Sequence, residues 1–180
     1  SLAKMEQMGV HDMIWGRLTD SMWYKSGDEL PMDQFIHPRA EPEIAFLIKK
    51  DLDREISLDE IPEYIQACAP AIEVIDSRYE NFKFSLEDVI ADNCSSSAFV
   101  IGAWQPLPAS LNDLEISLSF DKEIMQSDSS NAILDNPYLI IYIFIYPQLL
   151  VYFGACLGQI LSLLNLIKQI IYMFLHYDND

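Results

Sequence analysis

The alternation of apolar and polar residues predicts that strands dominate most of the chain. Residues 114–120 alternate strictly and predict a half-buried strand, and residues 121–123 are suited to a hairpin turn after it. Apolar runs at 37–49, 71–78 and 98–102 predict three further strands, the second of which is interrupted by an acidic residue. These segments are therefore expected to form a sheet.

Two helices are predicted around the second of these strands. Ser57 and Glu60 have the spacing of a capping box, apolar residues recur at helical spacing over 58–68, and Pro70 would end the helix. Ser85 can cap a second, short helix. Helical segments are thus expected before and after residues 71–78.

The C-terminal part of the chain has a different pattern. No charged residue occurs between Tyr138 and Ile167, so by length this segment is a candidate membrane span. One proline and two glycines interrupt it, and two short buried elements are the alternative. We expect one domain over residues 1–180 with an apolar tail at 138–180, covered by the domain or by another subunit, and no membrane insertion.

Two carboxylates lie one residue apart in the first apolar run. In a strand Glu41 and Glu43 share one face, with their Cβ atoms about 7 Å apart. Like charges beside apolar neighbours resist desolvation unless a cation or water accompanies them. A bound divalent metal is one interpretation. The other is an edge strand with one solvated face, where Pro42 would be tolerated because it cannot donate to a central ladder.

A third carboxylate, Glu73, interrupts the run at 71–78. Three carboxylates together with water form a suitable oxygen shell for Mg²⁺ or Mn²⁺, which are hard ions. The alternative is a salt bridge in which Glu73 or Asp76 pairs with Arg78 or Arg39. The sequence pattern leaves both open.

Composition narrows the classes of function. A chain of 180 residues with 51% hydrophobic residues suits one globular domain. Its formal net charge of −17 would repel a phosphate backbone, so nucleic-acid binding is not expected, whereas metal cations would be attracted.

The cysteines do not indicate a zinc site or a disulfide framework. Cys68, Cys94 and Cys156 form no C-x-x-C pair, and a reducing cytoplasm is the simplest setting for them. Cys68 lies on the apolar side of the predicted helix and is expected to pack in the core. The N-terminal residues lack the apolar core of a signal peptide.

Small polar residues, among them three consecutive serines, fill residues 91–97 just before the strand at 98–102. Backbone amides and hydroxyls gathered in such a loop can hold an anion. An ordinary turn is the alternative.

Three segments carry a resemblance to a known family. Residues 39–46 read RAEPEIAF, residues 71–84 read AIEVIDSRYENFKF, and residues 88–93 read DVIADN and are followed by the serines. In order and spacing they resemble the hydratase/decarboxylase family of aromatic meta-cleavage pathways. That family comprises 2-oxopent-4-enoate hydratases and 4-oxalocrotonate decarboxylases, relatives of the fumarylacetoacetase fold. The resemblance covers residues 5–136.

The resemblance implies an α+β fold, a strongly curved mixed β-sheet with flanking helices, which this chain would leave incomplete at both ends. It also implies that Glu41, Glu43 and Glu73 correspond to the ligands of Mg²⁺ or Mn²⁺, and that Ser95 lies in the loop that meets the substrate. No other cofactor is implied.

The implied activity is that of a carbon–carbon lyase in the cytoplasm. Residues 75–84 look more like the decarboxylases, so we expect metal-dependent decarboxylation of 2-oxo-3-hexenedioate (4-oxalocrotonate) to 2-oxopent-4-enoate through a metal-stabilised dienolate. A hydratase that adds water to 2-hydroxypenta-2,4-dienoate-type substrates and a catalytically impaired family remnant are the alternatives. The implied partners are a small 2-oxo acid and, for assembly, further copies of the chain or a partner hydratase.

Two departures from the family pattern affect this expectation. The family lysine, in a Lys-x-Gly-Leu-Thr-Ser type motif, would fall just upstream of Ser1, and another acid of the hydratases would fall near Ile14. Residues 158–162 resemble the family's Gly-x-Ile-Ile-Leu-Ser strand only weakly, and residues 163–180 match no family pattern. We therefore expect a truncated or altered member whose catalytic residues, beyond the metal ligands, are unidentified.

Overall fold

The computed structural model describes residues 16–51, 54–132, 136–139, 141–142 and 171–174. Seven strands are described: β1 (Trp23–Lys25), β2 (Arg39–Ile48), β3 (Ile65–Ile75), β4 (Ser96–Ile101), β5 (Glu115–Phe120), β6 (Glu123–Ser129) and β7 (Ile171–Phe174). An α-helix, α2, covers Leu86–Ala91, and residues 137–139 and 141–142 are also helical. Short 3-10 segments are η1 (Asp20–Met22), η2 (Met32–Gln34), η3 (Leu58–Tyr64), η4 (Glu80–Phe82), η5 (Asn93–Ser95) and η6 (Ser130–Ala132).

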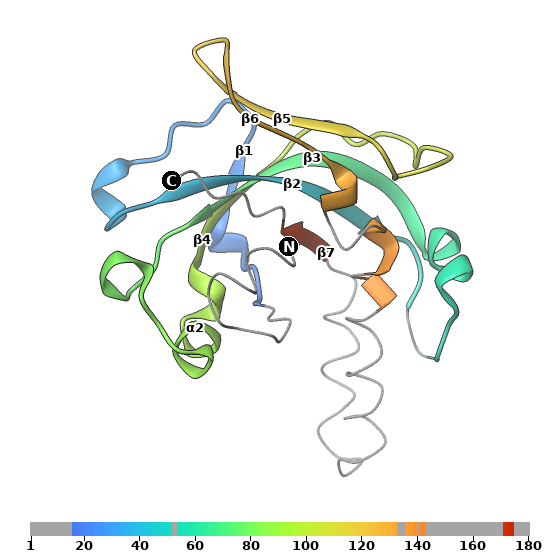
Figure 1. Cartoon of the computed structure of the whole chain (residues 1–180), viewed down its shortest axis with the longest axis horizontal. Coiled ribbons are helices and arrows are strands. Elements are labelled where there is room, and N and C mark those ends of the chain that lie inside the picture. Colours follow the sequence, from blue (N-terminus) through green and yellow to red (C-terminus); the bar gives the residue numbers. More distant parts are fainter. Residues whose placement is uncertain (1–15, 52–53, 133–135, 140, 143–170, 175–180) are drawn as a thin grey trace.

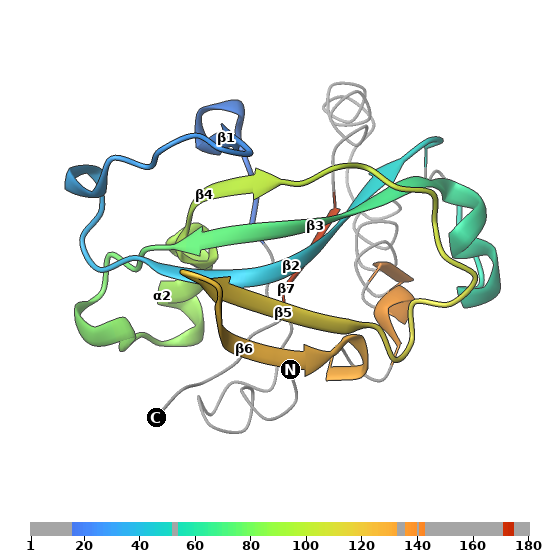
Figure 2. The same ribbon diagram turned by 90° about the horizontal axis from the view of Figure 1, so that it is seen from above.

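Five strands form a curved mixed sheet in the order β1-β4-β3-β2-β7. β1 runs parallel to β4, and the remaining neighbours are antiparallel. The long strands β2 and β3 arch across the molecule, with the hairpin of β5 and β6 above them (Figures 1 and 2). The expected α+β fold with a curved mixed sheet is confirmed.

The pairing of β2 with β3 is the longest ladder of the sheet. It runs from Arg39 opposite Ile75 to Ile48 opposite Ile65. The helix predicted over 58–68 is therefore wrong in its second half. A 3-10 segment forms only over Leu58–Tyr64, and the chain then enters β3 because its backbone groups can pair with the whole length of β2.

The two faces of this ladder have different surroundings. Ile44 and Phe46 point to one face, where they join a core cluster that contains Ile61 and Leu111 and that packs against Ile116 of the hairpin. Because side chains alternate along a strand, the odd-numbered residues of β2 point to the opposite face. The hydrophobic core thus supports one face and leaves the other for polar chemistry.

The hairpin confirms the strand and turn predicted at 114–123. Asp121 and Lys122 connect β5 to β6 with φ values of 49° and 71°. Two consecutive residues with positive φ form the turn that matches the twist of antiparallel strands. The short helix predicted after Ser85 is also confirmed, since Ser85 and Asp88 form a reciprocal capping box at the start of α2.

β2 is an interior strand, so the edge-strand interpretation of the E-x-E motif is wrong. Its pairing with β7 covers Glu43 to Phe46 and begins just after Pro42, which cannot donate to a ladder. Glu41 and Glu43 are buried, and neither is the solvated side chain that the edge interpretation required.

Most of the apolar tail lies outside the described residues. At its start Ile141 is buried in the core cluster, and Tyr138 and Tyr142 pack against that cluster. Near its end β7 extends the sheet beside β2. In the described part of the chain, no helix is long and apolar enough to cross a membrane.

Candidate metal centre

Three glutamates from the two longest strands come together on the face opposite the core. One carboxylate oxygen from each of Glu41, Glu43 and Glu73 lies within 4.8 Å of the other two. Glu41 is 7% exposed, Glu43 1% and Glu73 0%. Three carboxylates this close and this deeply buried need a counter-charge or a proton.

Strand register explains the convergence. Glu41 lies directly opposite Glu73 across the β2–β3 ladder, and Glu43 lies two residues farther along the same face. Directly opposed residues in an antiparallel pair have Cβ atoms about 5 Å apart, and like charges at such positions destabilise a sheet. A fold that keeps this register accepts an electrostatic cost that a bound cation would remove.

Glu73 has the most unusual environment of the three. Its Oε1 accepts a 2.6 Å hydrogen bond from the Ser96 hydroxyl, whereas its buried Oε2 has no hydrogen-bond partner among the described residues. Burial raises the pKa of Glu73 from 4.5 to about 8; the Ser96 hydrogen bond opposes this rise, and the charge of Glu41 adds to it. An unpartnered buried oxygen on a carboxyl beside two further carboxylates fits the donor set of a cation site.

Ser96 reaches Glu73 because of a β-bulge. In the β3–β4 ladder Val74 lies opposite Ala98 but Ile75 lies opposite Ser96, so Ser97 is an extra residue on β4. A bulge of this kind redirects side chains next to a site. Sequence reasoning missed Ser96; the run of three serines was the available signal, but it did not show which hydroxyl points to the glutamates.

The segment just before β4 is a left-handed turn. Asn93, Cys94 and Ser95 have φ values of 53°, 58° and 60°. Such values are costly for residues other than glycine and cluster at functional sites. Asn93 secures the turn through its side-chain amide, which accepts from the backbone N–H of Arg17 at 2.7 Å and donates to the Arg17 carbonyl at 2.8 Å. Gly16 permits this approach, because a Cβ there would lie 2.7 Å from the Asn93 carbonyl oxygen.

Cys94 lies in this turn, near the glutamates. Burial raises the pKa of its thiol to about 11, and the charges of Glu73 and Asp92 add to the rise. Cys94 is thus a neutral thiol at ordinary pH and a poor nucleophile.

Ser95, the predicted substrate contact, is 2% exposed. Its hydroxyl donates to the Asp92 carboxylate at 3.0 Å, and its carbonyl accepts from the backbone N–H of Asp76 at 2.8 Å. The structure therefore places Ser95 next to Ser96 but directs its hydroxyl toward Asp92. Its role toward a substrate stays a prediction.

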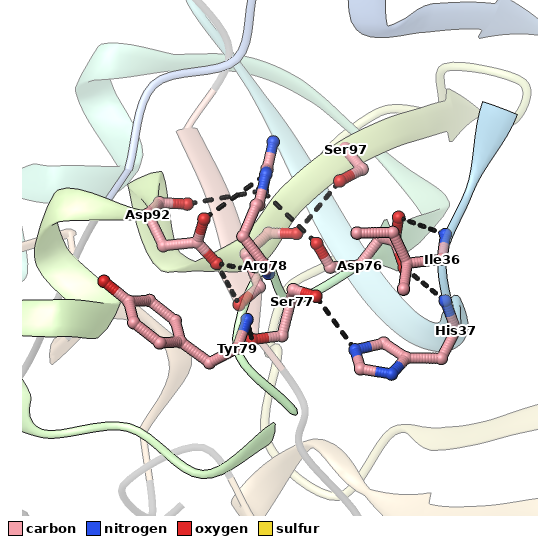
Figure 3. A network of polar contacts seen from close by, with 9 residues as sticks. Ile36, His37, Asp76, Ser77, Arg78, Tyr79, Asp92 and Ser97 are labelled. Carbon is pink, nitrogen blue, oxygen red and sulfur yellow. Dashed lines mark hydrogen bonds and ion pairs between the residues drawn. The ribbon is translucent and has the colours of Figure 1, made fainter. Parts of the chain in front are cut away.

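A polar network joins the end of β3 to its neighbours (Figure 3). Asp76 accepts the backbone N–H groups of Ile36 and His37 at 2.8 and 2.7 Å, which fixes the segment that leads into β2. Arg78 forms an ion pair with Asp92 at 3.3 Å. The salt-bridge alternative for the acidic residues is therefore wrong, because neither Glu73 nor Asp76 forms an ion pair with Arg78 or Arg39 in the described part of the chain.

Small side chains continue the glutamate face toward the other end of the ladder. Ala45, Ala69 and Ala71 form a buried cluster with Ile101 beside it. Ala71 lies opposite Glu43, and Ala45 lies opposite Ala69. Methyl groups at these positions leave more room above the strands than larger residues would.

The fold and this arrangement agree with a known family. Residues 6–144 match the family described as Fumarylacetoacetate (FAA) hydrolase C-terminal, and the chain belongs to it. It is 50% identical over 137 residues to a 4-oxalocrotonate decarboxylase of Pseudomonas sp., a match that covers 76% of this chain and 54% of the relative. A 2-hydroxypent-2,4-dienoate hydratase of Pseudomonas putida is 33% identical over 141 residues, covering 76% of this chain and 64% of the relative. The family resemblance in the sequence is confirmed.

Solved structures give the same result. The 4-oxalocrotonate decarboxylase from Pseudomonas putida G7, complexed with magnesium and adipate, superposes with a TM-score of 0.77 at 34% identity and covers 86% of this chain. The match covers 59% of the solved chain. Across these comparisons our chain spans 54–64% of the length of its relatives.

Proposed function

We propose that this chain is a divalent-metal-dependent carbon–carbon lyase that decarboxylates 2-oxo-3-hexenedioate to 2-oxopent-4-enoate. The observation that carries the proposal is the convergence of three buried carboxylates, one of which keeps an unpartnered oxygen. The 50% identity to a 4-oxalocrotonate decarboxylase supports the choice of reaction.

Glu41, Glu43 and Glu73 would hold Mg²⁺ or Mn²⁺, since three anionic oxygen donors suit hard cations and leave positions for substrate. Bound there, the ion would supply Lewis acidity for the negative charge that develops as CO₂ leaves a 2-oxo acid. Ser96 fixes the orientation of the Glu73 carboxylate, and the buried strands around the three glutamates limit the access of bulk water.

Release of CO₂ tests the reaction directly. The chain, supplemented with Mg²⁺ or Mn²⁺, is expected to release CO₂ from 2-oxo-3-hexenedioate and to lose this activity when the metal is chelated. Detection of CO₂ together with analysis of the organic product separates the two family reactions. A water adduct without CO₂ would contradict the decarboxylase assignment.

A hydratase is the second candidate, and the 33% identity to a hydratase favours it. It would use the same glutamates and add water to a 2-hydroxypenta-2,4-dienoate-type substrate. A catalytically impaired family remnant is the third candidate. Calorimetry tests this candidate, because a remnant without a functional metal centre would show no affinity for Mg²⁺ or Mn²⁺. Substrate contact by Ser95, a cytoplasmic setting, and assembly with further copies or with a partner hydratase also remain predictions.

Replacing Ser96 with alanine tests how the centre is oriented. The substitution removes the donor to Glu73, so Mg²⁺ affinity should fall about 10-fold to 100-fold, as for other residues that orient metal ligands. The free energy of unfolding should fall by about 1–3 kcal/mol, because a buried acceptor loses its hydrogen-bond partner. Isothermal calorimetry and urea unfolding measure the two effects.

Ser97→Ala is the matched control for Ser96→Ala. The Ser97 hydroxyl donates to the Ser95 carbonyl at 3.2 Å and does not contact Glu73. Equal losses of Mg²⁺ affinity in the two variants would contradict an orienting role for Ser96.

A further inference from the structure

Arg39 lies on the strand that carries two of the three glutamates. It is the first residue of β2 and precedes Glu41 by two positions, so alternation places it on the glutamate face. Two residues of strand span about 6.8 Å. Arg39 therefore lies at the exposed end of β2, two residues from the nearest proposed metal ligand.

The guanidinium is held in place by an aromatic ring. Its carbon lies 4.2 Å from the centroid of the Phe82 ring, a cation–π contact. The same ring stacks with His37, with centroids 4.8 Å apart. Phe82 has a φ of 54° and its neighbour Asn81 a φ of 55°, which is an unfavourable backbone for a bulky side chain. The chain thus accepts strain at the residue that positions Arg39.

Arg39 keeps its charge available for a ligand. The ion pairs of the described residues are Lys50–Glu63, Arg54–Glu60 and Arg78–Asp92, and none of them includes Arg39. An exposed and oriented guanidinium offers paired N–H donors that match a carboxylate. The negative charge of the nearby glutamates repels an anionic ligand. A positive side chain beside them would offset this repulsion for the second carboxylate of a diacid.

We propose that Arg39, positioned by Phe82, binds the second carboxylate of a six-carbon 2-oxo diacid whose 2-oxo acid end faces Glu41, Glu43 and Glu73. This inference rests on the proposed function and names the feature that selects a diacid over a monoacid. Arg39 and Glu41 are neighbours on one face of β2, with Cβ atoms about 7 Å apart, so their side chains can reach opposite ends of one extended ligand. A hydratase acting on a monocarboxylate would have no use for this contact.

Calorimetry with unreactive acids tests the inference without relying on turnover. With Mg²⁺ present, Arg39→Gln should weaken adipate binding by about tenfold, as expected for the loss of a charge-assisted contact, and should leave hexanoate binding within about twofold. Arg39→Lys should recover part of the adipate affinity, because it restores the charge but not the paired geometry. In steady-state assays with 2-oxo-3-hexenedioate, the change in Arg39→Gln should appear chiefly in KM.

Lys83→Gln provides the matched control. Lys83 is exposed, follows Phe82 directly and carries the same charge, but no ion pair or hydrogen bond of the described residues involves its side chain. An equal loss of adipate affinity in Lys83→Gln and Arg39→Gln would overturn the inference, since it would show a general charge effect. Equal weakening of adipate and hexanoate in Arg39→Gln would also overturn it.

A titration with Mg²⁺ alone separates this inference from the proposed function. If the unaltered chain binds no Mg²⁺, both the proposed function and the role of Arg39 are overturned. If it binds Mg²⁺ normally and its adipate affinity does not depend on Arg39, only the role of Arg39 is overturned.

Discussion

Glutamine in place of Glu73 is expected to abolish the metal-dependent activity of this chain. The substitution keeps the size of the side chain and an oxygen that can accept from Ser96, but it removes one of three anionic donors. Mg²⁺ affinity should fall by ~100-fold or more, and activity at a fixed metal concentration by ~1,000-fold, because Lewis acid stabilisation contributes several kcal/mol. Calorimetric titration with Mg²⁺ and the CO₂ assay measure the two losses.

Glu29→Gln is the control for this experiment, because Glu29 is exposed, lies outside the group of three glutamates and undergoes the same side-chain change. A folding defect would not explain the expected difference, since neutralising a buried carboxyl should leave the metal-free protein at least as stable. If Glu73→Gln binds Mg²⁺ as tightly as Glu29→Gln does, Glu73 is not a ligand.

The metal-free chain should become less stable as the pH rises from about 4.5 to about 8. Glu73 has a pKa of about 8 in the folded protein against 4.5 for an ordinary glutamate, because it is buried. Between these values the folded state binds more protons than the unfolded state, so the free energy of unfolding falls with rising pH. The stabilising contribution is complete below pH 4.5 and is lost by pH 8, and its size is on the order of 4 kcal/mol.

Urea unfolding in the presence of a chelator, repeated at several pH values, measures this slope. Glu73→Gln should flatten it, and saturating Mg²⁺ should restore stability at pH 8, because the cation replaces the proton. Glu60, whose pKa is lowered to about 2 chiefly by Arg54, affects stability only at more acidic pH and in the opposite direction. A flat profile for the unaltered chain would contradict the environment assigned to Glu73.

The local parts of the fold could be predicted from sequence because they depend on short-range chemistry. The Ser85 capping box, the turn at Asp121 and Lys122, and the shared face of Glu41 and Glu43 all follow from residues a few positions apart. The prediction was wrong for the second half of the helix over 58–68, because long-range pairing determines the structure there. Its apolar spacing suited a helix, but pairing with a strand distant in sequence determined its conformation.

The candidate site also has parts that the sequence predicts and parts that depend on strand pairing. Carboxylates in apolar runs identified the three glutamates, but only the register of β2 against β3 places Glu41 opposite Glu73. Ser96 could not be chosen from among three serines, because the bulge depends on how β4 meets β3. The sequence suggests Arg39 only as a salt-bridge partner, because its contact with Phe82 joins residues 43 positions apart in the sequence.

The bulge in β4 also affects what a one-residue deletion in this strand would do to the site. A one-residue shift in a regular strand exchanges its two faces and would normally remove a site. Here the residues that compete for the position opposite Ile75 are Ser96 and Ser97, so either alignment offers a hydroxyl to Glu73. Loss of one serine would leave a regular strand with its hydroxyl still facing inward. The serine run should therefore make this part of the site tolerant of the loss of one serine, whereas a one-residue deletion in a regular strand would exchange its faces.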